Sequence, residues 1–177
     1  MPAQLVLTPF HEVAHVAAGL EADIADSLLQ ALQPLPRTLI TGQGRSGLVG
    51  RAFAHRLMHL GVDSHVVGDV TCPAVVEDDL MVLISGSGTT STTVRQARIA
   101  RKVGATVATV TAVADSELSA QADTRLVVPV DAAVSCQFAS TLFSQCVQLI
   151  FDGICMQLAD TWRREHGYLY ARHSNLE

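Results

Sequence analysis

Charged side chains and aromatic rings are both scarce in this sequence. Only 16% of its 177 residues are Asp, Glu, Lys or Arg and only 5% are aromatic, whereas 49% are hydrophobic. The 12 basic residues are outnumbered by 17 acidic ones, which gives a formal net charge of −5. Non-specific nucleic-acid binding needs a basic surface and is excluded, so any bound anion must be held by local chemistry. The apolar composition predicts that part of the surface packs against other subunits.

The sequence has no zinc-type cysteine motif, and we expect neither a leader nor a membrane span. Cys72, Cys136, Cys146 and Cys155 form no Cys-x-x-Cys pair and have no histidines at zinc spacing, so we expect buried thiols in a reducing compartment and no metal site. The first ten residues lack the basic start and the long apolar core of a signal peptide. No apolar run approaches the roughly 20 residues that span a bilayer. We therefore expect a cytoplasmic protein.

Apolar periodicity alternates along the chain between helical and strand-like spacing. No linker, repeat or low-complexity stretch interrupts it, so residues 1–177 are predicted to form one domain. Such alternation predicts an α/β fold with parallel strands, helices on both faces and ligands beyond the carboxyl ends of the strands. The predicted helices are about 9–35, 46–60, 90–103, 116–121 and 136–165, the predicted strands are 38–41, 65–67, 80–84, 106–110 and 126–128, and a polar tail covers about 166–177.

Seven hydroxyl side chains lie within the turn and helix start that follow the apolar run Leu80–Ile84. The segment reads Ser-Gly-Ser-Gly-Thr-Thr-Ser-Thr-Thr from Ser85, and its glycines allow a ligand close to the backbone. Free N–H groups at the start of the next helix add a partial positive charge, so the turn suits a phosphate without a lysine. The alternative is that the cluster only caps the helix, but one cap needs one hydroxyl.

A second glycine-rich turn, Gly42–Gly47, matches Gly-x-Gly-x-x-Gly, and Asp69 follows near the end of the next predicted strand. Alone, this pattern is typical of dinucleotide binding with a ribose-binding acid. The turn after Ile84 argues against that reading, because a dinucleotide fold needs no second phosphate cradle there. Arg45 and Ser46 also offer a charged donor and a hydroxyl to a compact anion.

Taken together, the two turns resemble those of the sugar isomerase (SIS) domain family and, within it, the 6-phospho-3-hexuloisomerases. The resemblance covers nearly the whole chain after the first helix. Its motifs are Gly44–Gly47, Arg56–Gly61, Val67–Pro73, Ser85–Gly88, Ala122-Asp123 and the tail Arg172–Glu177.

This resemblance implies a three-layer αβα sandwich with a five-stranded parallel sheet of flavodoxin-like type, assembled as a homotetramer with sites near subunit interfaces. It implies interconversion of 3-hexulose 6-phosphate and fructose 6-phosphate through a cis-enediol, without metal or organic cofactor, in the ribulose monophosphate pathway. The partner is thus a phosphorylated sugar, with no nucleic acid and no membrane. The residues expected to bind phosphate or sugar are Gly44, Arg45, Ser46, Ser85, Gly86, Ser87, Thr89, Thr90 and Asp69.

The sequence departs from the family at the position of the favoured catalytic base. The related enzymes have a glutamate where the stretch Ala139–Gln145 has Ser144, and a hydroxyl is a far poorer base than a carboxylate at neutral pH. The family often has Glu where Asp69 and Thr89 stand. Three alternatives stay open: another base (His59, or His173 or Glu177 from a neighbouring subunit), a different phosphosugar, or sugar-phosphate binding without turnover.

Two further function classes remain as rivals. A sugar-phosphate sensor is one, because SIS modules serve in some transcription regulators, but no helix-turn-helix or basic extension is present. A dinucleotide-binding enzyme is the other, based on the Gly42–Gly47 turn and Asp69.

Overall fold

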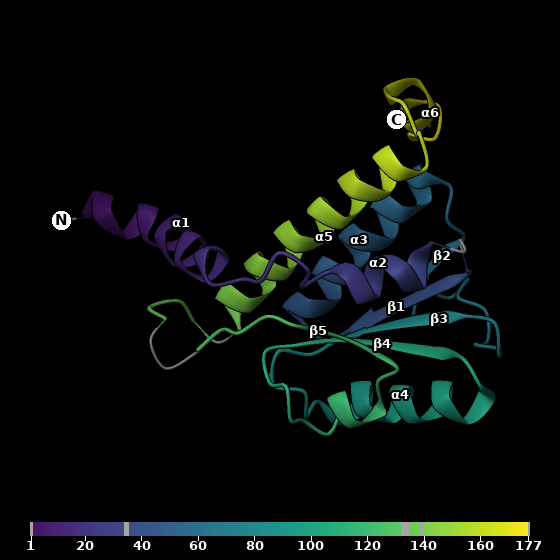
Figure 1. The fold of residues 1–177 in the computed structure, drawn as a ribbon, viewed down its shortest axis with the longest axis horizontal. Coiled ribbons are helices and arrows are strands. Elements are labelled where there is room, and N and C mark those ends of the chain that lie inside the picture. The colour runs from purple at the N-terminus through teal and green to yellow at the C-terminus, as the bar shows by residue number, and fades with distance from the viewer. Residues whose placement is uncertain (1, 34–35, 132–134, 139, 177) are drawn as a thin grey trace.

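The protein is described from a computed structural model, which covers residues 2–33, 36–131, 135–138 and 140–176 (Figure 1). In chain order the elements are α1 (Pro2–Ala18), α2 (Asp26–Leu32), β1 (Thr38–Gly42), α3 (Arg45–Leu60), β2 (Ser64–Val66), β3 (Leu80–Ile84), α4 (Ser91–Val103), β4 (Thr106–Thr111), the 3-10 helix η1 (Ser119–Gln121), β5 (Thr124–Val127), α5 (Thr141–Thr161) and α6 (His166–Tyr170).

The five strands form one parallel sheet in the order β2-β1-β3-β4-β5. The order reverses between β1 and β3, where the chain moves from one side of β1 to the other, and ligands of such sheets bind in the crevice at that switch point. α3, α5 and α2 cover one face of the sheet and α4 covers the other (Figure 1). The predicted α/β fold, a three-layer αβα sandwich on a five-stranded parallel sheet, is confirmed.

Alternate residues of each strand serve two separate apolar cores. Ile40, Val82 and Val110 point to the core beneath α3 and α5. Leu83 and Val107 point to the smaller core beneath α4. Because both faces are covered, the predicted strand 80–84 is a continuous apolar run, and all five of its residues are buried.

The predicted N-terminal helix over 9–35 is wrong in its extent. The chain forms two helices, α1 and α2, separated by turns over residues 19–25. α1 ends before Gly19, whose N–H bonds the Val16 carbonyl in a tight turn. Pro9 lies inside α1 rather than at a helix start. The apolar spacing continues across the break, so periodicity alone did not reveal it.

The other end of the chain also differs from its predicted boundaries. The last long helix spans Thr141–Thr161 rather than 136–165. The predicted tail contains the short helix α6, which packs on α3. Tyr168 makes this contact, because its hydroxyl lies against Gly61, the C-cap of α3, while the Arg164 and Arg172 guanidinium groups lie 4.2 and 3.9 Å from its ring centre.

Within the described ranges, one helix, α5, is long and apolar enough to cross a membrane. Its most apolar 18-residue stretch has a mean hydropathy of 1.3. The expectation that no segment reaches that length is therefore corrected. Half of that stretch is buried inside the fold, where α5 packs on α3 and α1. This burial identifies α5 as a core helix.

Glu12 of α1 fastens the loop that leads into α5. Its carboxylate accepts hydrogen bonds from Ser135 Oγ at 2.8 Å, Cys136 N at 2.8 Å and Gln137 Nε2 at 2.9 Å. These bonds, with that from the Gln137 amide the strongest cause, hold the pKa of Glu12 below its usual value. α1 is thereby tied to a segment more than 120 positions away, beside the carboxyl edge of the sheet.

A second carboxylate fixes the opposite, amino edge of the sheet. Asp79 is 3% exposed and forms a bidentate pair with Arg37, at 2.8 Å to Nε and 2.7 Å to Nη2, and it accepts a bond from Val76 N. Burial raises the pKa of Asp79, but the bonds from Arg37 and Val76 outweigh it, so the pKa lies below its usual value. Asp79 therefore stabilises the fold in its charged form.

Replacing Asp79 with Asn is expected to lower the free energy of unfolding by about 1–3 kcal/mol at neutral pH, because a buried donor set loses its charged acceptor. The stability gap between wild type and Asp79→Asn should stay constant above the ordinary aspartate pKa of about 3.9 and shrink as the pH falls below it. Urea unfolding at several pH values measures both effects. Asp78→Asn, one residue away and exposed, is the matched control; an equal loss in that variant would contradict the role of the pair.

Candidate functional site

The two glycine-rich turns meet at the switch point between β1 and β3. Gly42 pairs in register with Ile84, so the turns begin side by side. A Cβ on Gly42 would lie 2.8 Å from the Ser46 carbonyl carbon and 3.0 Å from the Ile84 oxygen, and one on Gly47 would lie 2.6 Å from the Gly42 oxygen. Glycine at these two positions lets the first turn of α3 pack directly against the end of β3.

In the second turn, hydroxyl groups bond to one another rather than to the helix that follows. Ser85 Oγ and Thr90 Oγ1 lie 2.8 Å apart, and Thr89 Oγ1 lies 3.0 Å from Ser87 Oγ. Gly88 has a φ of +65°, and a Cβ there would collide with the Ser116 side chain. Thr90 is the N-cap residue of α4, yet its side chain makes no capping bond. The alternative that this cluster only caps the helix is therefore not supported.

The first turns of α3 and α4 have backbone N–H groups without hydrogen-bond partners in the described chain, beside these hydroxyls. Neither α3 nor α4 has a side-chain cap, and within the described chain the first-turn amides of α4 have no backbone partner. Uncapped N-termini carry partial positive charge and donors that suit an anion. The β1–β3 pairing brings to the same edge of the sheet the residues Gly44, Arg45, Ser46, Ser85, Gly86, Ser87, Thr89 and Thr90. We call the turn Ser85–Thr90 with the start of α3 the cradle.

The start of α5 closes one side of the crevice. A Cβ on Gly86 would lie 3.1 Å from the Phe143 ring, so the cradle and α5 are in contact. Ser144, which is 2% exposed, accepts a hydrogen bond from Arg45 Nε at 3.0 Å and donates one to the Thr141 carbonyl at 2.8 Å. Its proton is committed to a carbonyl and its lone pair faces a guanidinium. Ser144 is therefore unsuited to act as a base.

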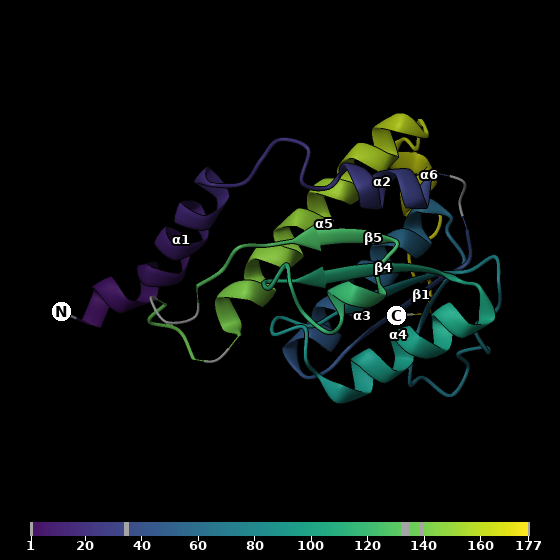
Figure 2. The ribbon, with the colours of Figure 1, turned by 60° about the horizontal axis from the view of Figure 1, so that its bottom comes forward.

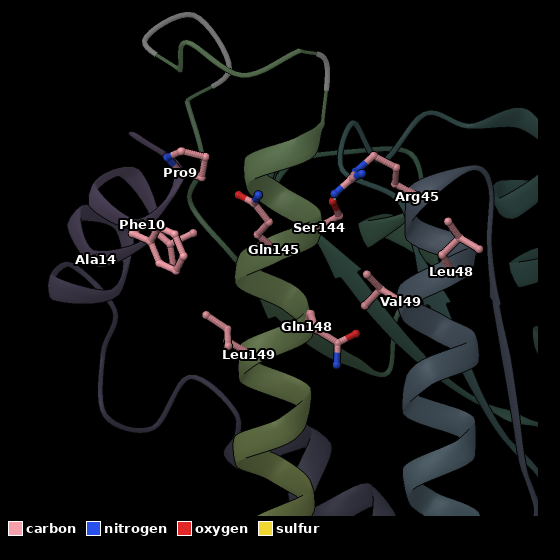
Figure 3. A pocket seen from close by; sticks show the side chains of 11 residues that line it. Pro9, Phe10, Ala14, Arg45, Leu48, Val49, Ser144, Gln145, Gln148 and Leu149 are labelled. Atoms are coloured by element: carbon pink, nitrogen blue, oxygen red, sulfur yellow. The ribbon is translucent and has the colours of Figure 1, made fainter. Parts of the chain in front are cut away.

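A pocket of about 580 Å³ opens beside Ser144 between α1, α3 and α5 (Figure 3). In Figure 3 the Arg45 side chain reaches from α3 toward Ser144, while Phe10 of α1 faces Leu149 of α5. Among the described residues that line it, none carries a carboxylate or an imidazole. They are Pro9, Phe10, Val13, Ala14, Arg45, Leu48, Val49, Ser144, Gln145, Gln148 and Leu149.

Asp69 is not brought to the cradle. It follows β2, which lies on the other side of β1 from β3. Its carboxylate pairs with Arg51 of α3 at 2.5 Å, in a separate pocket of about 300 Å³ that also includes His55 and His65. A ribose-binding role would require Asp69 to exchange this partner, which weakens the dinucleotide alternative.

His59 and His173 lie at the far end of α3 from the cradle. With a rise of about 1.5 Å per residue, His59 is roughly 20 Å along the helix from Ser46. Its ring stacks on that of His173 at 5.5 Å, and both of its nitrogens are buried without a partner in the described chain. Burial, then His55, His173 and Arg56, lower the pKa of His59, so its imidazole is neutral at pH 7.

Figure 2 shows the same separation: the arrowheads of β4 and β5 point toward α1 and the start of α5, whereas α6 lies at the other end. Within one chain these histidines therefore do not meet the cradle. Glu177, the other tail residue considered as a base, lies outside the described residues.

Sequence reasoning missed the contribution of α1 and of two glutamines to the pocket. Phe10 and Val13 form its outer wall, although the apolar spacing of α1 resembled that of any core helix. Gln145 and Gln148 face it from α5. The available signal was the pair of amides at i and i+3 in an otherwise apolar helix, which places both on one face.

Known proteins are similar in sequence to this chain over most of its length. The chain is 40% identical to the 3-hexulose-6-phosphate isomerase of Mycobacterium gastri over 173 residues, covering 94% of this chain and 86% of the relative. It is 31% identical to the 3-hexulose-6-phosphate isomerase of Bacillus subtilis over 180 residues, covering 97% and 95% of the two chains.

Solved structures share the fold. The crystal structure of a hypothetical protein from Methanococcus jannaschii superimposes on this chain with a TM-score of 0.87 at 26% identity. A molecular function of 3-hexulose-6-phosphate isomerase has been inferred for that protein from its structure. The superposition covers 98% of this chain and 99% of that one. Residues 32–150, which include both turns and the start of α5, match the SIS domain. The chain belongs to the SIS domain family.

Proposed function

We propose that the protein is a phosphosugar isomerase that interconverts 3-hexulose 6-phosphate and fructose 6-phosphate. The observation that carries this proposal is the contact between the cradle and the start of α5, which joins an anion site to a polar pair, Arg45 and Ser144, in one crevice. The relatives named 3-hexulose-6-phosphate isomerase match nearly the full chain and support this substrate.

The phosphate is held by neutral donors. Ser46, Ser85, Ser87 and Thr90 supply hydroxyls, and the open amides of α3 and α4 supply N–H groups and dipole charge. Gly44, Gly86 and Thr89 complete the cradle through their backbone. A phosphate fixed there directs the sugar chain toward Arg45 and Ser144, so that binding energy remote from the reacting carbons orients them.

The reaction moves two protons and leaves the carbon chain intact. A base removes the proton from carbon 2 of the 3-hexulose, next to the carbonyl at carbon 3, and an enediol forms across these carbons. A proton passes between the two oxygens, and carbon 3 receives a proton to give the 2-ketose. The Arg45 guanidinium stabilises the negative charge that develops on the oxygens.

The base is not Ser144, whose hydrogen bonds exclude that role. We propose that it comes from the tail of a second copy of the chain, through His173, in a homotetramer with sites near subunit interfaces, because both ring nitrogens of His59 are buried within its own chain. The exposed apolar side chains of α1 and α5, among them Leu5, Phe10 and Met156, support such an assembly. The setting that we propose is the ribulose monophosphate pathway in the cytoplasm.

A second candidate function is phosphosugar binding without turnover. The commitment of Ser144 to Thr141 and Arg45 favours it, because none of the described residues that line the pocket in one chain is then a base. The two candidates share the cradle and differ only in catalysis.

The cradle is tested by binding. Ser85→Ala and Ser87→Ala should each weaken the affinity for fructose 6-phosphate by about ten- to hundredfold, because each removes a hydrogen bond to a charged group. Isothermal titration calorimetry measures the dissociation constant. Ser27→Ala is the control, since that hydroxyl bonds only the Arg125 carbonyl; an equal loss there, or none in the cradle variants, would contradict the proposed phosphate site.

The reacting end is tested by restoring a carboxylate. Ser144→Glu should raise the rate of fructose 6-phosphate formation from 3-hexulose 6-phosphate by at least tenfold, since a positioned general base contributes about 10²–10⁴-fold. A coupled assay that reduces NADP⁺ reports the product. A high natural rate that falls in Ser144→Glu would show that the natural base needs an uncharged residue beside Arg45.

The origin of the base is tested by mixing inactive variants. His173→Ala should lose about 10²-fold or more in kcat, and Ser85→Ala should be nearly inactive at substrate concentrations well below its weakened dissociation constant. If each active site combines residues of two subunits, mixing the two variants and letting them exchange subunits should form some sites that contain both His173 and Ser85. Those sites should regain activity. Retention of full activity in His173→Ala would overturn the assignment of the base to this histidine.

A further inference from the structure

Arg45 is a cation without a charged partner. Its Nε donates to the neutral hydroxyl of Ser144 at 3.0 Å, and the terminal nitrogens of its guanidinium have no hydrogen-bond partner in the described chain. Four other arginines are each paired with an aspartate or glutamate. Arg45 is exposed and lines the pocket beside Ser144, so its free donors are available to a ligand.

Among the described residues that line the pocket, no carboxylate competes for the Arg45 guanidinium. The Gln145 Oε1 atom on this wall is an acceptor that is buried without a partner in the described chain, so it suits a hydroxyl of the sugar rather than the carboxylate. Gln148 donates to Asp152 at 3.2 Å. Asp152 lies eight residues beyond Ser144 on α5, about 12 Å along the helix, and does not line the pocket.

The start of α5 adds to the positive field at the same point. α5 has no side-chain cap, and Ser144 lies in its first turns. A ketose oxygen would satisfy one donor of the guanidinium, whereas a carboxylate can accept two parallel bonds from it with full charge complementarity. The pocket beside Ser144 therefore suits an anionic group better than a neutral one.

We infer that the site binds phosphorylated sugar acids, with the phosphate in the cradle and the carboxylate on Arg45, more tightly than neutral phosphosugars of the same length. The phosphate half of this inference rests on the proposed function; the carboxylate half rests on Arg45 and the pocket alone. The ligand class is a linear or ring-opened sugar that carries a phosphate at one end and a carboxylate at the other.

Two ligands that differ only at carbon 1 test the inference. Gluconate 6-phosphate carries a carboxylate there, and glucitol 6-phosphate carries a hydroxymethyl group on the same chain. Isothermal titration calorimetry on the full chain should give a dissociation constant about ten- to hundredfold lower for gluconate 6-phosphate. The ratio should fall as NaCl rises, because a contact at an exposed arginine is screened.

Matched variants assign the effect to one side chain. Arg45→Gln should bring the ratio of the two dissociation constants close to one while glucitol 6-phosphate still binds. Ser144→Glu should reverse the ratio, because its carboxylate would occupy the guanidinium and repel the ligand. Arg98→Gln, an exposed arginine of α4 that pairs with Glu117, should leave the ratio unchanged. Thermal midpoints of all variants check that each is folded.

Equal dissociation constants in the wild type, or a ratio that survives Arg45→Gln, would overturn this inference and leave the phosphosugar site standing. Failure of gluconate 6-phosphate, glucitol 6-phosphate and fructose 6-phosphate to bind would overturn the proposed function as well.

Discussion

The pairing of β1 with β3 is the constraint on which the site depends. It sets Gly42 opposite Ile84, so two turns that are far apart in the sequence start from adjacent strand ends. Glycine at 42 and 47 then allows α3 to begin against the end of β3, and the cradle follows from that contact. A side chain at either glycine would push the two helix starts apart and separate the hydroxyls from the amides.

Much of the fold was predictable because local signals and burial agree. The strand Leu80–Ile84 is apolar throughout since both of its faces are covered, and the helices before Gly61 and Gly104 end where glycine adopts a left-handed conformation. The break between α1 and α2 was not predictable, because its apolar spacing continues while tertiary contacts decide the boundary. One such contact is the Glu12 carboxylate, whose three partners lie at the other end of the chain.

The phosphate-binding end of the site could be predicted from the sequence better than the end where the sugar would react. Composition alone marked the hydroxyl-rich turn, because no structural role needs seven hydroxyls in nine residues. Strand order decided the rest: β2 lies outside β1, so Asp69 faces Arg51 rather than the cradle, and α3 runs away from the crevice, so His59 reaches the opposite edge. Neither fact can be read from spacing in the sequence.

The two faces of the sheet are unequally protected. Beneath α3 and α5 lies the larger core, whereas the smaller one is covered by α4, by Leu118 next to η1 and by the segment after β2. Local opening costs least where few apolar contacts are lost, so we expect α4 to open at lower free energy than α3 and α5. Its first turn is also half of the cradle. An anion bound there raises the cost of that opening, which makes hydrogen exchange in α4 a reporter of occupancy.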